Sequence, residues 1–92
     1  MAYRLNYHPH VLDMDLPALD PNTRRRIDGA IRGHLALNPG RIGIPLRREL
    51  RGTWKYRIGD HRVVFQIAGP EIRILAIRLR SDVYQVVEGR TT

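Results

Sequence analysis

A hairpin pattern lies in residues 54–67, where the sequence is WKYRIGDHRVVFQI. Apolar and polar side chains alternate from Trp54 to Ile58, and a mainly apolar run follows Gly59-Asp60; both patterns are typical of β-strands. We therefore expect strands over Thr53 to Ile58 and Arg62 to Ala68, joined by a tight turn at Gly59-Asp60. A connection this short makes the two strands antiparallel neighbours.

The second of these strands carries apolar residues on both faces, with Val64 and Ala68 on one and Phe65 and Ile67 on the other. A strand of this kind is covered on both sides, so we place it in the centre of a sheet. Gly69-Pro70 then supplies another turn, and residues 71–78 (Glu71 to Arg78) predict a third strand.

The residues before the hairpin change from a strand period to a helical one. Tyr3 to Tyr7 alternates and predicts a half-buried strand. Pro9 fits the first turn of a short helix that Pro17 should end or bend. Asp20-Pro21 is a typical start for a second helix, which Asn38-Pro39-Gly40 ends. Its apolar face is expected to contain Ile27, Ala30, Ile31, His34 and Leu35.

Arg41 to Leu50 is expected to be a loop, and Ser81 can cap a last helix from Asp82 to Val87. The element order is then β-α-α-β-β-β-α. This order predicts an α+β fold, a small antiparallel sheet with helices on one face and the other face open. The chain has 92 residues without repeats or a linker, so we expect a single domain over residues 1–92.

The composition indicates a polyanionic partner. The 16 Lys and Arg residues exceed the 9 Asp and Glu residues, which gives a formal net charge of +7. Lys55 is the only lysine, and arginine offers a planar fork of donors that matches phosphate. A charge of this sign on a short chain is typical of a nucleic-acid binder or of a protein with an acidic partner.

Several classes of protein are excluded or disfavoured. Cysteine is absent, which rules out disulfides and thiolate zinc sites. No apolar run is long enough to span a membrane and the N-terminus does not resemble a signal peptide, so we expect a cytoplasmic protein without a membrane partner. His8 and His10 lack an evident third ligand, so neither a metal nor another cofactor is expected. Asp13, Asp15 and Asp20 are expected to face solvent.

The basic residues of the second half fall on adjacent strands. Lys55 and Arg57 are two apart and share one face, and Arg62 opens the next strand. Arg78 ends the third strand, Arg80 follows it, and Tyr84 projects from the last helix. Such cations can simply be solvated. They also suit metal-independent RNA cleavage, in which the 2′-OH loses a proton, the phosphorane is stabilised and the 5′-oxygen gains a proton.

Four stretches resemble the core of RelE/ParE-type toxins. They are residues 50–52 (LRG), 54–67, 74–77 (ILAI) and 80–84 (RSDVY), in the family's order and at its spacings. The resemblance implies the same element order. It also implies a toxin of a toxin–antitoxin pair with a cognate antitoxin as partner. In the RelE branch, such a toxin is an endoribonuclease that cleaves mRNA, at the ribosomal A site, and inhibits translation.

The resemblance also implies roles for five catalytic residues. Lys55 and Arg57 match a basic pair that activates the nucleophile and contacts phosphate. Arg62 matches an arginine that stabilises the transition state, Arg78 one that acts near the leaving group, and Tyr84 a tyrosine that orients the substrate. Four further residues are expected to contact RNA: Arg51, Trp54, His61 and Arg80. For Trp54 the alternative is a core position, and for His61 a turn position.

The chain also departs from the family pattern. Leu79 stands where many relatives carry histidine, so cleavage by histidine at that position is excluded. Arg62 and Tyr84 also match the ParE branch, whose members inhibit DNA gyrase without cleaving RNA, and this is the alternative function. A third possibility is an inactive relative that only binds its antitoxin.

Overall fold

The predicted hairpin lies in the middle of the sheet in the computed structural model, which describes residues 2–90. β3 (Trp54–Ile58) and β4 (His61–Ala68) are antiparallel, and Gly59 turns between them with a φ of 60° that glycine adopts without strain. β5 (Glu71–Leu79) is the antiparallel neighbour of β4. The three predicted strands are therefore confirmed, with ends that differ by one residue at most.

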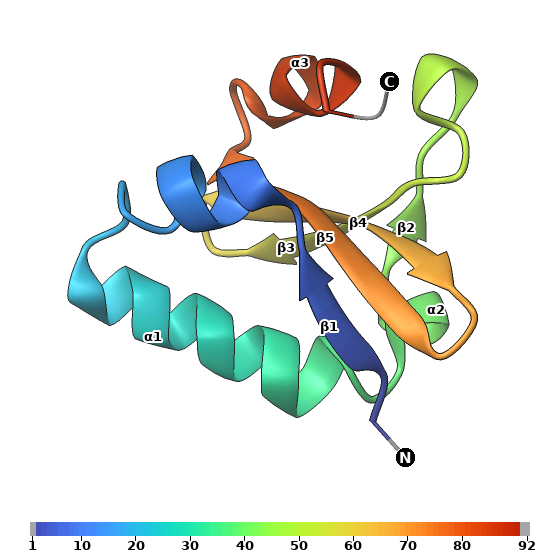
Figure 1. The fold of residues 1–92 in the computed structure, drawn as a ribbon, viewed down its shortest axis with the longest axis horizontal. Coiled ribbons are helices and arrows are strands. Elements are labelled where there is room, and N and C mark those ends of the chain that lie inside the picture. The colour runs from blue at the N-terminus through green and yellow to red at the C-terminus, as the bar shows by residue number, and fades with distance from the viewer. Residues whose placement is uncertain (1, 91–92) are drawn as a thin grey trace.

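Two short strands complete a sheet in the order β1-β5-β4-β3-β2 (Figure 1). β2 (Ile44–Pro45) joins the outer edge of β3, and β1 (Arg4–Tyr7) pairs with β5 in parallel. The sheet is thus mixed, where a purely antiparallel one was expected. The direction of β1 could not follow from a turn, because the whole of the chain's helical half separates it from β5.

The first half of the chain forms the expected helices, with local departures from α-helical geometry. The first helix contains a π-helical segment, η1 (Val11–Asp15). α1 (Pro21–Ala30) begins at Asp20, whose carboxylate accepts a hydrogen bond from the Thr23 N–H at 2.9 Å, as expected of an N-cap. It continues as the π-helical η2 (Ile31–Leu35). The wider π winding turns His34 outward, so its expected place on the apolar face was wrong.

The expected loop over residues 41–50 contains short elements. α2 (Pro39–Ile42) precedes β2, and a 3-10 turn, η3 (Arg48–Leu50), precedes β3. Gly43, between α2 and β2, permits a close approach to the core: a Cβ at this position would lie 2.6 Å from Cζ of Phe65 and 2.8 Å from the Pro39 carbonyl oxygen. A side chain there would have to displace the buried phenyl ring.

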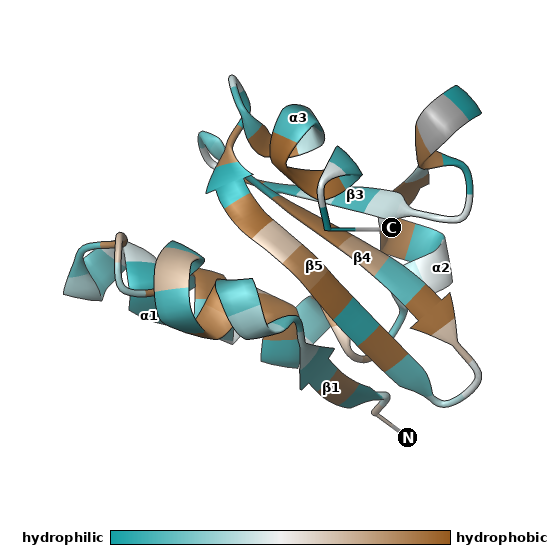
Figure 2. Cartoon of the chain, turned by 45° about the horizontal axis from the view of Figure 1, so that its top comes forward, coloured by the Kyte–Doolittle hydropathy of each residue, from teal (hydrophilic) through white to brown (hydrophobic). Residues whose placement is uncertain are grey.

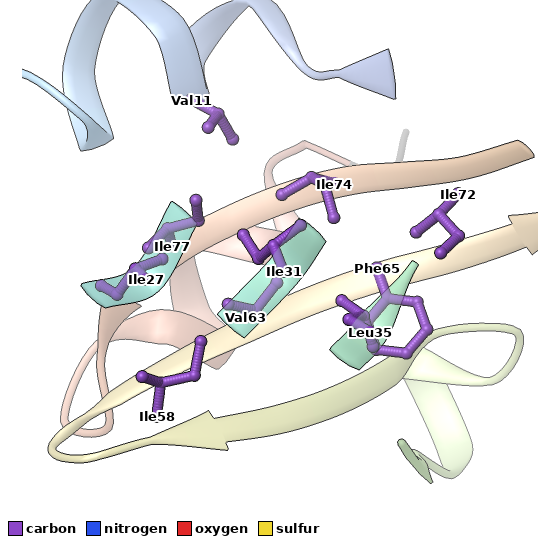
Figure 3. Close-up of a cluster of buried hydrophobic side chains, with 10 residues drawn as sticks. All are labelled: Val11, Ile27, Ile31, Leu35, Ile58, Val63, Phe65, Ile72, Ile74 and Ile77. Carbon is purple, nitrogen blue, oxygen red and sulfur yellow. The ribbon is translucent and has the colours of Figure 1, made fainter. Parts of the chain in front are cut away.

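One layer of the core lies between the sheet and α1 with η2 (Figures 1 and 3). Ile27, Ile31 and Leu35 are four residues apart and point from the helices toward the strands. They meet Val63 and Phe65 of β4, which are fully buried. The other members are Val11, Ile58, Ile72, Ile74 and Ile77. This layer confirms that β4 is central.

The last helix, α3 (Val83–Glu88), lies on the opposite face of the sheet (Figure 1). Its Val83 and Val87 pack on Val64, Leu75 and Ala76, all of them buried. The α+β class is confirmed, but helices cover parts of both faces rather than one. The second apolar surface of β4 and β5 explains the difference, because it needs a cover of its own. Figure 2 shows this as long apolar stretches on β5 beside α3.

Among the helices of residues 2–90, none is long and apolar enough to cross a membrane.

Candidate functional site

Three arginines form a row across the sheet. Arg57 of β3 is the register partner of Arg62 on β4, which is the partner of Arg78 on β5. Direct partners project from the same face, so the three side chains emerge side by side, with neighbouring Cβ atoms about 5 Å apart. Lys55 lies two residues before Arg57 and shares this face. The sheet therefore brings together four of the five residues expected to be catalytic.

The guanidinium groups of Arg57 and Arg62 are held by backbone carbonyls of the β3–β4 turn. Arg57 Nε donates to the Gly59 carbonyl oxygen at 3.2 Å. Arg62 Nη1 donates to the same oxygen at 3.2 Å and to the His61 carbonyl oxygen at 3.1 Å. No carboxylate whose side chain the structure describes forms an ion pair with either residue. Their charges are thus oriented and uncompensated.

Arg78 ends the row in a different state. Its Nη2 donates to Asp82 Oδ2 at 2.6 Å, its Nε to the same oxygen at 3.1 Å, and its Nη1 to Asp15 Oδ1 at 3.3 Å. The hydrogen bond to Asp82 is the main reason that the pKa of Arg78 is raised. Because a guanidinium has five N–H groups, two remain for a ligand. Arg78 is therefore fixed in place and still able to donate.

Asp15 is the buried anchor of this arrangement, and the expectation that it faces solvent was wrong. The residue is 2% exposed, and its carboxylate accepts from the Ile77 N–H at 2.9 Å. Arg90 donates to both of its oxygens, at 2.7 and 3.0 Å. Burial alone raises the pKa of Asp15, but the hydrogen bonds from Arg90 and Ile77 outweigh it and leave the pKa lowered. Sequence reasoning missed Asp15 and Arg90, since only the tertiary fold joins η1 to the end of α3.

Two open pockets flank the arginine row. One, of about 390 Å³, lies at the edge of β3 and is lined by Ile42, Ile44, Lys55, Tyr56, Arg57 and Arg62. The other, of about 440 Å³, lies at the end of the sheet and is lined by Arg57, Asp60, Arg62, Leu79, Arg80 and Ser81. Arg57 and Arg62 belong to both, so an anion bound between them would be reachable from either side.

The remaining expected residues are not all at this surface. Tyr84 is half-buried against the cluster of Val64 and Val83, on the face that carries the row but outside both pockets. Trp54 lies on the opposite face, where its ring stacks on Phe65 with a centroid distance of 6.4 Å. The core alternative for Trp54 is the one that matches this position.

Of the other residues expected to contact RNA, one lines a pocket beside the arginine row and two do not. His61 pairs with Ile58 and Leu79, and its side chain therefore projects from the face opposite to Arg62. Arg51 is exposed in the turn after η3 and lines neither pocket. Arg80 lines the second pocket, where its N–H donates to the Asp60 carbonyl oxygen at 3.2 Å. Among the described residues, no group of three or more metal-ligating side chains is present.

Comparison with known proteins identifies the family of this chain. The model of the ParE toxin of the type II toxin–antitoxin system parDE matches residues 5–84. Toxin RelG of Mycobacterium tuberculosis is 34% identical over 73 residues, which are 77% of this chain and 84% of RelG. The toxin–antitoxin complex RelBE2 of M. tuberculosis contains a chain with a TM-score of 0.81 and 30% identity, over 87% of this chain and all of that one.

A mutant of Escherichia coli toxin RelE in the free state has a TM-score of 0.76 over the whole of both chains. Its sequence identity is 18%, so this likeness shows the fold alone.

Proposed function

The chain belongs to the RelE/ParE superfamily of toxins from type II toxin–antitoxin systems, and from this premise we propose that it is a metal-independent endoribonuclease that cleaves mRNA at the ribosomal A site. Cleavage there inhibits translation, and the protein acts in the cytoplasm. The single observation that carries the proposal is the pair of uncompensated guanidinium groups on Arg57 and Arg62.

Two like charges directly opposite each other on neighbouring strands destabilise a sheet. The Arg57–Arg62 pair is in register, and the Gly59 carbonyl holds both groups at the β3–β4 turn. A phosphate between them would remove the repulsion and accept hydrogen bonds from both forks. An arrangement that is costly without a ligand and favourable with an anion supports a phosphate site.

The chemistry follows from the positions around that phosphate. Lys55, in its neutral amine form, takes the proton of the 2′-OH, whose oxygen attacks the adjacent phosphorus. Arg57 and Arg62 stabilise the negative charge of the phosphorane, and the P–O5′ bond breaks. The 5′-oxygen takes up a proton from water, and the other product is a 2′,3′-cyclic phosphate. Arg78, oriented by Asp15 and Asp82, acts near the leaving oxygen, and Tyr84 orients the substrate.

The decisive experiment incubates the protein with programmed ribosomes and maps the mRNA ends. We expect new 5′ ends at A-site codons with the wild type, without added metal. An Arg24→Ala variant is the matched control, because Arg24 is an exposed arginine on α1 that lines neither pocket beside the row. Intact mRNA after incubation with a folded wild type would reject the nuclease.

The family model favours one second candidate. It describes ParE toxins and matches most of this chain, so inhibition of DNA gyrase is the alternative function. A gyrase supercoiling assay run beside the ribosome assay separates the two. Inhibited supercoiling with intact mRNA would assign the chain to this alternative.

We further propose a cognate antitoxin as partner. One relative was solved as a toxin–antitoxin complex, and the net charge of +7 favours an acidic antitoxin segment. Co-expression with a small neighbouring reading frame, followed by pull-down, tests this. We expect a complex that weakens with salt. Failure to form a complex at micromolar concentrations would contradict the proposal.

A further inference from the structure

A third guanidinium group reaches the β3–β4 turn, and it comes from α1, which covers the face opposite to the arginine row. Apart from its chain neighbours, the atoms nearest to a Cβ built on Gly59 belong to Arg26: Nη1 lies 3.1 Å away, and Cζ and Nη2 lie 3.5 Å away. Arg57 and Arg62 donate to the carbonyl oxygen of the same glycine. Three arginines therefore meet at one turn residue, whose missing side chain permits the approach of Arg26.

The packing of α1 holds Arg26 in this place. Ile27, the next residue of the helix, is 1% exposed and belongs to the same core layer as Ile58, the last residue of β3. Figure 3 shows the side chains of Ile27 and Ile58 at the same end of this cluster. The backbone of α1 is thus fixed beside the turn, and the Arg26 side chain extends from it to the end of the sheet.

The charge of Arg26 is uncompensated, and the sequence of α1 explains why. Side chains three or four residues from Arg26 are its neighbours on the helix, and none of them is acidic. They are Asn22, Thr23, Gly29 and Ala30. Arg32, by contrast, follows Asp28 by four residues and pairs with it at 2.9 Å. No carboxylate whose side chain the structure describes forms an ion pair with Arg26.

The turn therefore places two uncompensated basic groups close together. The Arg26 guanidinium lies at the Cβ position of Gly59 and that of Arg62 at its carbonyl oxygen, so their nearest nitrogens are less than about 10 Å apart. An RNA strand with one phosphate between Arg57 and Arg62 that continues over the turn brings its neighbouring phosphate toward Arg26. Phosphate contacts of this kind fix the register and orientation of a nucleic acid.

We propose that Arg26 binds the phosphate next to the one held by Arg57 and Arg62, and that it fixes the path of the RNA strand over the β3–β4 turn. The inference rests on the proposed function, because it requires a single RNA strand at this surface. It makes Arg26 a substrate-positioning residue that contributes to RNA affinity and takes no part in bond breaking.

The test measures how RNA binding depends on salt, because each phosphate contact releases counterions. The probe is a fluorescent, fully 2′-O-methylated oligonucleotide, which cannot be cleaved, and its Kd is measured by anisotropy at a series of salt concentrations. Arg26→Ala should make the plot of log affinity against log salt shallower by about 0.7, the loss of one phosphate contact on a single strand. Arg26→Lys should keep most of the slope, because an ammonium group still neutralises a phosphate.

The matched control is Arg25→Ala, which removes the same charge from the adjacent residue of α1. Arg25 is also exposed, but it donates to the Asn22 side chain and lines a different pocket, with Leu12 and Leu16. This variant should keep the wild-type slope, and circular dichroism melts check that the variants are folded. A wild-type slope in Arg26→Ala, or an equal decrease in Arg25→Ala, would overturn the inference. A decrease confined to Arg26→Ala together with intact mRNA on ribosomes would retain the phosphate contact and reject only the nuclease.

Discussion

Arg57 and Arg62 face each other without a carboxylate between them, whereas two other arginines of this half of the chain form ion pairs. Arg78 contacts Asp82 and Asp15, and Arg90 contacts Asp15. The same fold thus neutralises one set of arginines and leaves another open. At the scale of single residues, this contrast separates groups that hold the structure together from groups that await an anion.

Inorganic phosphate should therefore stabilise the protein through Arg57 and Arg62. Binding to the native state alone adds about 2.7 kcal/mol at one hundred times Kd, which raises Tm by several degrees. In a thermal melt with increasing phosphate, Arg62→Ala should lose most of this rise. Arg73→Ala is the control, since Arg73 is an exposed arginine of β5 that pairs with Glu71. Equal responses of the two variants would contradict an anion site at Arg62.

Asp15 should matter for stability and for its dependence on pH. Removing one partner of a buried ion pair costs about 3–5 kcal/mol, so Asp15→Asn should lower the free energy of unfolding by an amount of that order. Asp13→Asn, an exposed neighbour in η1, should change little. Both are measured by chemical denaturation at neutral pH.

The sign of the pH effect follows from the lowered pKa of Asp15. Its folded pKa lies below the ordinary value of 3.8, so its contribution is fully present above that value and is lost as the pH falls through the folded pKa. Between pH 5 and pH 2, stability should therefore fall more steeply in the wild type than in Asp15→Asn. Parallel curves would contradict the proposed ionised anchor.

At the scale of elements, local patterns predicted what local contacts decide. The residue patterns of β3, β4 and β5 and the tight turns between them specified three strands and their directions, and with them the row of Arg57, Arg62 and Arg78. The parallel pairing of β1, the second helical layer under α3 and the burial of Asp15 depend on contacts between distant parts of the chain. No periodicity within a single segment contains that information.

The approach of Gly43 to Phe65 gives a test at this scale. Gly43→Ala places a Cβ 2.6 Å from the Phe65 ring and should destabilise the protein by about 1–3 kcal/mol through overpacking. Gly33→Ala is the matched control. No atom lies within 4 Å of its added Cβ, and helix propensity favours alanine there. Urea denaturation of both variants should show opposite signs, and an unaffected Gly43→Ala would contradict the packing of α2 against β4.

The whole molecule is small, with a Cα radius of gyration of 12.0 Å, and it combines a net positive charge with the arginine row on its sheet. Nonspecific attraction to RNA arises from the total charge and weakens with salt. Catalysis instead requires particular donors at the phosphorus. A variant that removes one charge from the row and leaves the fold intact separates the two contributions.

The most direct measurement is cleavage of mRNA on programmed ribosomes by wild type and Arg62→Ala, with circular dichroism melts of both. Loss of one transition-state donor should lower the cleavage rate about 10²–10³-fold. Arg62→Ala should melt no lower than the wild type, because the hydrogen bonds of the Arg62 side chain go to turn carbonyls at the rim of the sheet and its loss removes the repulsion with Arg57. Cleavage by Arg62→Ala at the wild-type rate would contradict the assignment of this arginine row as the catalytic phosphate site.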